Sequence, residues 1–249
     1  MKIEKFSKQR NSMYNLILED GTKIKIHEDL ILKYSLLLTK QIDDSLLEQL
    51  HKENQIYEIY EMALKYINIK LRSRKELYEY LVKKNYEKTN INTILDMLIK
   101  QGYLDDKIYA TSFVHDKILM SSYGPNKIKS ELHSYGISNE IIDEVIISFD
   151  ENLEKERIDK LINKQIKANH NKGPMLLKKK IQSYLLNLGY SSSLINQSLN
   201  VMKFVDNSLY QKEYDKLYTK LSKKYSGKEL EYKLKKKMYQ KGFSNFDYE

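Results

Sequence analysis

The chain contains no cysteine and only two prolines and eight glycines among its 249 residues. Without cysteine it can form neither disulfide bonds nor thiolate sites, which fits a reducing compartment. Because so little proline and glycine interrupts a chain rich in Leu, Ile, Lys and Glu, we expect helix almost throughout. No apolar run approaches the ~20 residues of a membrane span, and residues 1–10 are too polar for a signal peptide. The composition therefore predicts a mostly helical cytoplasmic protein without a membrane segment.

The side chains that usually carry catalysis or bind metals are few and scattered. The histidines are His27, His51, His115, His133 and His170. None of them forms a His-Glu-x-x-His motif, and there is no cysteine to complete a zinc site. Asp105 and Asp106 are adjacent carboxylates, but neighbouring side chains on a helix point about 100° apart. We expect this pair to serve as helix cap and first-turn anion. The sequence thus predicts no enzyme activity, no cofactor and no metal.

A pattern recurs at intervals of 51, 53 and 53 residues, at Asn85, Gly136, Gly189 and Gly242. Apolar residues lie four and eight positions before each of these anchors: Leu81, Leu132, Leu185 and Met238, and Leu77, Ile128, Ile181 and Leu234. Another follows one position after each anchor: Tyr86, Ile137, Tyr190 and Phe243. Serine comes next at Ser138, Ser191 and Ser244. Gly or Asn can end a helix in the left-handed conformation, and Ser can cap the next one.

This recurrence predicts a mostly α fold, an elongated solenoid of tandem three-helix repeats. The length of the repeat and the absence of a Trp-x-x-Leu-Gly pattern argue against tetratricopeptide units. The expected parts are an N-terminal β-hairpin and helices at 1–55, repeat 1 at 56–103, repeat 2 at 104–149, repeat 3 at 150–205 and a truncated repeat 4 at 206–249. The expected repeat helices span 57–71, 73–84, 89–101, 105–122, 125–135, 138–148, 151–169, 174–188, 191–203, 207–225 and 228–241.

Repeat 4 should lack its third helix, because only seven residues follow Gly242. We expect Phe243, Phe246 and Tyr248 either to close the stack as an apolar lid or to lie free for a partner.

Apolar and polar residues alternate near the N-terminus, on both sides of Glu19-Asp20-Gly21, which predicts the β-hairpin. A three-residue loop with Gly21 in the left-handed conformation would pair Leu16 with Ile24 and Tyr14 with Ile26 on one face. Helices at 29–38 and 43–53 should pack under this hairpin.

The net charge of +9 is unevenly distributed along the chain. Residues 1–150 carry 22 Lys and Arg against 23 Asp and Glu, whereas residues 151–249 carry 21 against 11. Such an excess suggests a polyanion or an acidic protein surface as partner. Codon bias of an AT-rich genome could supply the lysines, but it does not explain why acidic residues become rare after residue 151.

Lys127, Lys180 and Lys233 occupy the same place in three successive repeats, directly before a predicted core residue. We predict that they form a row of cations that contacts the partner. Further candidate contacts are Lys178, Lys179, Lys236 and Lys237, with Arg72 and Arg74 at the first helix junction of repeat 1. Each of these could instead be part of an ordinary solvated helix face. Tyrosines could stack on nucleic-acid bases, but most, including Tyr86, Tyr135 and Tyr190, fall on core spacings and should pack inside.

Three stretches in order resemble the signatures of the RecX family, bacterial regulators of the RecA recombinase. They are Ala63-Leu64-Lys65-Tyr66-Ile67 with Leu71-Arg72-Ser73-Arg74-Lys75-Glu76-Leu77, then Gly102-Tyr103-Leu104-Asp105-Asp106 with Tyr109-Ala110, then Gly124-Pro125 leading to Glu131-Leu132 and Gly136-Ile137. The resemblance is close over 57–148 and looser in the other repeats. The hairpin and the extra repeat look like the longer RecX forms of low-GC Gram-positive bacteria. Asn85 departs from the family pattern, which commonly has Gly there.

The resemblance implies a non-enzymatic modulator without cofactor that lies in the groove of the RecA filament on single-stranded DNA. Such proteins mainly inhibit the recombinase, ATPase and co-protease activities of RecA. Arg72 and Arg74 are the best contact candidates that the resemblance offers. The two side chains could instead simply cover the helix junction around Ser73. A monomer is expected. One alternative is a protein that binds DNA directly through basic three-helix units, and another is a generic helical scaffold. A RecA modulator could also bind DNA directly, but weakly.

Overall fold

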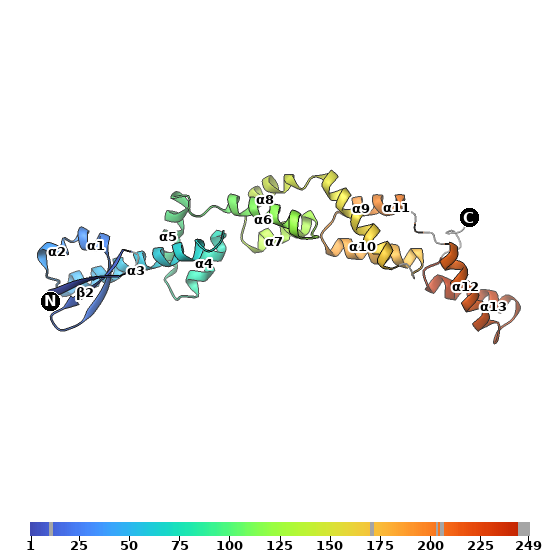
Figure 1. Ribbon diagram of the computed structural model, residues 1–249, viewed down its shortest axis with the longest axis horizontal. Helices are drawn as coiled ribbons and strands as arrows, with labels where there is room; N and C mark the ends of the chain where they lie inside the picture. The colour runs from blue at the N-terminus through green and yellow to red at the C-terminus, as the bar shows by residue number, and fades with distance from the viewer. Residues whose placement is uncertain (10–11, 170–171, 203, 205–206, 244–249) are drawn as a thin grey trace. The chain divides into compact units, whose positions relative to one another are not determined.

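The computed structural model describes residues 1–9, 12–169, 172–202, 204 and 207–243. The chain divides into two compact units. The first contains Met1–Tyr109 together with Tyr135–Ile137, and the second contains Ala110–Ser134 and the described residues from Ser138 onward. A small sheet lies at the N-terminal end, and helices follow along the rest of the chain (Figure 1). The predicted mostly α fold with tandem three-helix repeats and a small N-terminal β module is confirmed.

Three antiparallel strands form the sheet, β1 (Ile3–Lys8), β2 (Met13–Leu18) and β3 (Lys23–His27), in the order β1-β2-β3. The predicted hairpin register is confirmed, with Leu16 opposite Ile24 and Tyr14 opposite Ile26. Gly21 has φ of 81°, as the three-residue loop requires. The sequence did not predict β1, because only Ile3 in this strand is buried and no apolar alternation marks it.

The helices after the sheet differ from the prediction. The expected helix at 29–38 is two short helices, α1 (Glu28–Lys33) and α2 (Leu36–Thr39), with Ser35 between them at φ of 51°. The helices expected at 43–53 and 57–71 are one helix, α3 (Asp44–Ile67). Its buried residues come from both predicted segments: Leu50 packs with the sheet, whereas Ile59 packs in repeat 1. The boundary expected between residues 55 and 56 therefore falls inside α3.

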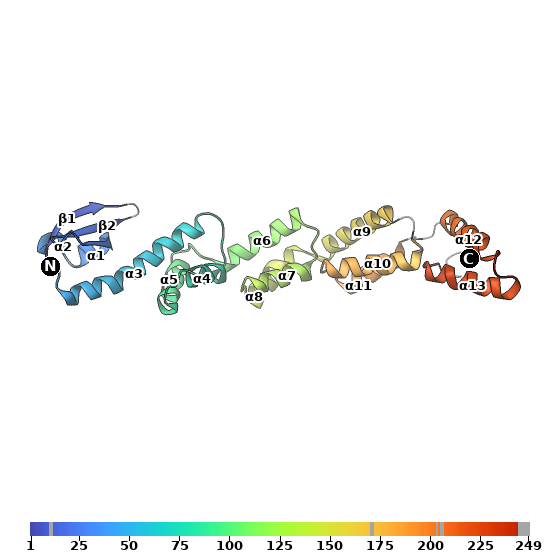
Figure 2. The same cartoon turned by 90° about the horizontal axis from the view of Figure 1, so that it is seen from below.

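The repeat helices lie close to their expected positions. Repeat 1 uses the end of α3 with α4 (Arg74–Val82) and α5 (Lys88–Lys100), and repeat 2 uses α6 (Asp106–Met120), α7 (Pro125–Ser134) and α8 (Asn139–Val145), which continues as a 3-10 turn at Ile146–Ser148. Repeat 3 consists of α9 (Glu151–Ala168), α10 (Pro174–Asn187) and α11 (Ser192–Val201), and repeat 4 of α12 (Asn207–Leu221) and α13 (Gly227–Gln240). The three helices of repeat 3 pack side by side (Figure 2).

The predicted core positions are buried. All eight apolar residues that lie four and eight positions before the anchors are exposed by no more than 4%. Asn85, Gly136, Gly189 and Gly242 have φ of 64°, 80°, 86° and 89°, so each anchor ends its helix in the left-handed conformation. Phe243 is buried, whereas Ser244, Phe246 and Tyr248 lie outside the described residues.

Candidate functional site

From Gly136 onward, each recurrent anchor turn contacts the start of the second helix of the preceding repeat, and we call this contact a joint. In the second unit, the carbonyl of Leu188 accepts a hydrogen bond from the Gly124 N–H at 2.7 Å, and that of Gly189 accepts from Asn126 at 3.0 Å. The next joint is equivalent, with Gly173 N–H bonded to Lys241 at 3.2 Å and Met175 N–H to Gly242 at 3.0 Å. The first N–H groups of one helix are thus satisfied by the last carbonyls of another, which removes two sets of unpaired groups at once.

Glycine is required at these joints because the two backbones touch. A Cβ on Gly124 would lie 2.7 Å from the carbonyl carbon and oxygen of Gly189, and a Cβ on Gly242 would lie 2.8 Å from the nitrogen of Leu176. Asn85 belongs to repeat 1, which follows the sheet module and has no repeat before it to dock on. Only the left-handed backbone is needed there, and asparagine tolerates it.

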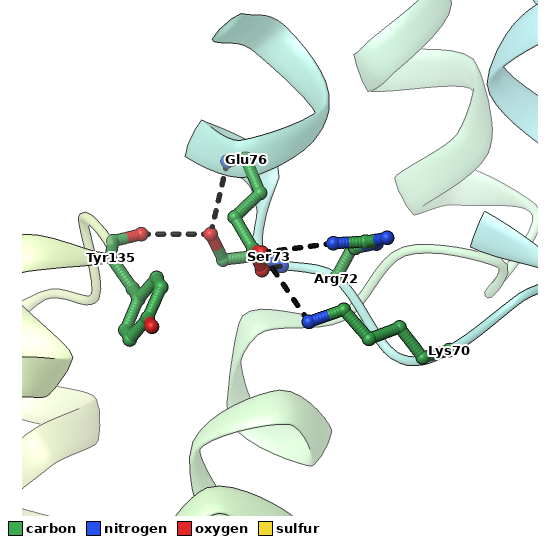
Figure 3. A network of polar contacts seen from close by, with 5 residues as sticks. All are labelled: Lys70, Arg72, Ser73, Glu76 and Tyr135. Carbon is green, nitrogen blue, oxygen red and sulfur yellow. Dashed lines mark hydrogen bonds and ion pairs between the residues drawn. The ribbon is translucent and has the colours of Figure 1, made fainter. Parts of the chain in front are cut away.

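The joint at the start of α4, in the first unit, uses side chains in place of one backbone contact (Figure 3). Ser73 is fully buried, donates from its hydroxyl to the carbonyl of Tyr135 at 2.8 Å and accepts from the Glu76 N–H at 3.1 Å. The Glu76 carboxylate accepts from the Ser73 N–H at 3.1 Å, which completes a capping box. Arg72 at 3.2 Å and Lys70 at 3.9 Å surround the same carboxylate.

A carboxylate from α6 extends this joint. Asp106 accepts from the Arg74 N–H at 2.7 Å, and burial raises the pKa of its carboxyl, opposed by the bond from Arg74. Asp105 caps α6 as expected, accepting from the N–H groups of Lys107 at 2.7 Å and Ile108 at 3.0 Å. The expectation of cap and first-turn anion is thus confirmed, and Asp106 has the further task of capping α4.

The two arginine candidates differ in their surroundings. The side chain of Arg72 is only 14% exposed, and its guanidinium lies 4.0 Å from the centre of the Tyr66 ring while bonding to Glu76. These contacts favour a structural task at the joint. The Arg74 side chain is 42% exposed and lies 3.5 Å from the carboxylate of Asp96. Arg74 therefore remains accessible to a partner.

Of the predicted lysine row, Lys127 lies at a joint, beside Gly189, whereas Lys180 and Lys233 lie farther along α10 and α13. Lys127, Lys180 and Lys233 each precede a buried residue, as the spacing predicted. Lys127 and Lys233 are half-buried, with their ammonium groups 5.9 Å from the Tyr123 ring centre and 5.4 Å from the Tyr225 ring centre. Lys180 is exposed and donates to Asn169 Oδ1 at 2.5 Å.

The remaining lysine candidates form two groups. Lys178 and Lys179 are exposed beside Lys180 on α10, and Lys236 and Lys237 are exposed on α13. The ammonium of Lys178 lies 5.1 Å from the ring centre of Phe204. The structure therefore collects the exposed candidates of the second unit on α10 and α13, while Arg72 and Arg74 belong to the first unit.

Arg157 and Glu154 on α9 are joint residues that the sequence did not single out. The Arg157 guanidinium donates to the carbonyls of Ile118, at 2.6 Å, and Ser121 at the end of α6. It also donates to the hydroxyl of the buried Tyr190 at 3.3 Å. A cation at a helix C-terminus opposes the negative end of the helix dipole. Glu154 is 8% exposed and accepts from the Ser191 N–H at 2.7 Å.

The sequence predicted a helix-capping role for Ser191 and a packing role for Tyr190, both at this joint. Ser191 is the N-cap residue of α11 but makes no capping bond with its side chain, so the predicted serine cap is wrong there, whereas Ser138 caps α8 through Ile141 at 3.4 Å. Tyr190 is 2% exposed and packs inside, as predicted.

Neither a metal centre nor a membrane helix is found within the described ranges. No group of three or more His, Asp or Glu residues there could hold a metal ion. In the same part of the chain, no helix is long and apolar enough to cross a bilayer.

Comparison with known proteins is consistent with these features. Residues 60–98 match the model of the first three-helix domain of RecX, and residues 105–146 match that of the second. The "Regulatory protein RecX" of Streptococcus uberis is 32% identical over 99% of this chain and 96% of its own length. The protein of the same name from Streptococcus gordonii is 33% identical, again over 99% of this chain and 96% of that protein.

Two solved structures share the fold. A crystal structure of regulatory protein RecX is 24% identical, with a TM-score of 0.70, over 80% of this chain and 98% of that chain. A structure of RecX from Lactobacillus salivarius is 27% identical, with a TM-score of 0.58, over 61% of this chain and 99% of that chain. The relatives that align along nearly the whole chain include its sheet module and fourth repeat, as expected for a long form. The chain therefore belongs to the RecX family of regulatory proteins.

Proposed function

We propose that this protein binds the RecA filament on single-stranded DNA and inhibits its recombinase, ATPase and co-protease activities. The regulatory name of its relatives supports a RecA partner. The observation that carries the proposal is the pair of joints in the second unit, because main-chain hydrogen bonds hold repeats 2, 3 and 4 together and so keep their outer faces in register. A protein built in this way, a monomer in the cytoplasm with RecA, can contact several protomers of a filament at once.

Several weak contacts suffice for this task. Once one repeat is bound, the next contacts its own site at a high effective concentration, so the combined affinity exceeds that of any single contact. The exposed lysines of α10, together with those of α13 and with Arg74, are the candidate contacts. They would face acidic filament surface or the phosphates of the DNA inside it.

The α10 lysines offer the cleanest test of this surface. Lys127 and Lys233 are half-buried against aromatic rings, so charge reversal at these two positions would also disturb local packing. We expect Lys178→Glu/Lys179→Glu/Lys180→Glu to lower affinity for the RecA filament about tenfold or more, because like charges would then face each other. Co-sedimentation with RecA assembled on single-stranded DNA measures this affinity.

A matched control reverses three exposed lysines on another helix, Lys155→Glu/Lys160→Glu/Lys164→Glu on α9. Equal losses in the two variants would mean that net charge alone matters, and undiminished binding of the α10 variant would reject the α10 surface. Direct binding of bare DNA is the second candidate function, favoured by the charge of repeat 4.

A further inference from the structure

Repeat 4 carries a high density of positive charge. Residues 207–243 contain eleven lysines against four acidic residues, a net charge of +7. Three of the four carboxylates already have partners, Glu213 with Lys241, Glu231 with Lys235 at 3.0 Å, and Asp215 with Gln211 at 2.8 Å. The exposed lysines are Lys212, Lys216, Lys220, Lys223, Lys224, Lys228, Lys235, Lys236 and Lys237. Most of this charge is therefore available to an anionic partner.

Aromatic rings alternate with the lysines on one side of α13. Lys228, Tyr232, Lys235 and Tyr239 are spaced by four, three and four residues, which places them on a single helix face. Tyr232 is 62% exposed and Tyr239 is 61% exposed. The residues that α13 buries, Leu234 and Met238, hold it against its neighbours. The two tyrosines are therefore not needed for packing.

One face of α12 carries exposed polar side chains. Gln211 and Asp215 lie 53 residues after Ile158 and Ile162, the separation that also relates Gly189 to Gly242. Ile158 and Ile162 are fully buried in repeat 3, whereas Gln211 and Asp215 are exposed and bonded to each other. Repeat 4 thus presents polar side chains where repeat 3 packs apolar ones, and among the described residues this face of α12 is exposed to solvent.

We propose that the α13 face, formed by Lys228, Tyr232, Lys235, Lys236 and Tyr239, binds single-stranded nucleic acid directly. The lysines neutralise phosphates, and the tyrosine rings stack on bases. Seven residues at about 1.5 Å of rise each set the two rings about 10 Å apart along the helix, enough for separate bases. An acidic protein surface would need the cations but not the exposed rings between them. Duplex DNA would expose no base faces to stack on, so the single strand is the favoured ligand.

This inference deepens the proposed function, because single-stranded DNA runs through the filament, but it concerns binding that needs no RecA. The test is fluorescence anisotropy of a labelled oligothymidine with the full-length protein at several salt concentrations. We expect Tyr232→Ala/Tyr239→Ala to weaken binding by about fivefold or more for each ring, while Tyr232→Phe/Tyr239→Phe keeps the wild-type affinity. Lys228→Gln/Lys235→Gln/Lys236→Gln should lower the slope of log affinity against log salt by about 2.

Lys155→Gln/Lys160→Gln/Lys164→Gln on α9 is the matched control and should leave affinity and slope nearly unchanged. Equal effects of the α13 and α9 lysine variants, or wild-type affinity of the double Tyr→Ala variant, would overturn the proposal. Loss of filament binding by the α13 variants with unchanged oligothymidine affinity would identify an acidic protein as the partner of this face and also overturn it. Oligothymidine binding without any effect on RecA would instead refute the proposed function and leave this site standing.

Discussion

At the scale of single residues, the anchor glycines meet two separate requirements. Gly189 adopts φ of 86°, which disfavours any side chain, and its Cβ would also meet the backbone of Lys127. Gly102, at the end of α5, has a similar φ of 76°, but a Cβ there would have open space around it. Substitutions at Gly102 and Gly189 therefore separate the free-energy cost of the left-handed backbone from the cost of disrupting the joint.

We predict that Gly102→Ala lowers the free energy of unfolding by about 1–2 kcal/mol, the cost of the left-handed conformation. Gly189→Ala should cost about 1–3 kcal/mol more, because the added methyl group collides with backbone that cannot rotate away. Urea denaturation followed by circular dichroism measures both values. Equal losses for the two variants would show that the close approach at Gly189 contributes nothing.

Asp106 provides a pH-dependent test of the joint at α4. An acid whose pKa is raised in the folded state keeps a proton that the unfolded chain releases, so stability falls as pH rises between the two pKa values. Asp106→Asn keeps an oxygen that accepts from Arg74 but removes the buried charge. We therefore predict that this variant is more stable than the parent at pH 7, with the difference disappearing as pH falls toward the ordinary Asp range of about 4.

Chemical denaturation at several pH values checks this prediction, with Glu48→Gln on the exposed side of α3 as the control for loss of one charge. An Asp106→Asn variant less stable than the parent at pH 7 would mean that the ionised carboxylate gains more from the Arg74 bond than it loses by burial.

At the scale of elements, local signals predicted most helix ends and missed what depends on distant contacts. Proline at the start of α7 and α10 and glycine after them act within a few residues, so these bounds are nearly right. The continuity of α3 has no such local signal, since one helix serves two cores. The strand β1 is likewise defined by pairing with β2 rather than by its own pattern.

The candidate site was predictable only in part, for the same reason. The spacing of Lys127, Lys180 and Lys233 was predictable because it repeats with the fold, but the different surroundings of the three side chains were not. Arg157 bonds to groups 33 to 39 residues away, and nothing in its local sequence announces this. A residue that recurs at the same position in each repeat can thus serve either to contact a partner or to hold two repeats together.

At the scale of the whole molecule, the protein combines a repeating scaffold with an unequal distribution of charge. The joints of the second unit rest largely on main-chain hydrogen bonds and glycines, which leaves the exposed faces of α10 and α13 free to carry lysines without loss of packing. The positive charge is concentrated after residue 151, where α10 and α13 provide the exposed candidate contacts. This arrangement supports the proposed binding of an anionic, repetitive partner.

The most direct test of this account is the ATPase rate of RecA on single-stranded DNA as the protein is titrated in. We predict that the rate falls progressively as protein is added, and that Lys178→Glu/Lys179→Glu/Lys180→Glu requires a higher concentration for the same loss. An ATPase rate that stays unchanged at saturating protein would contradict the proposed inhibition of RecA.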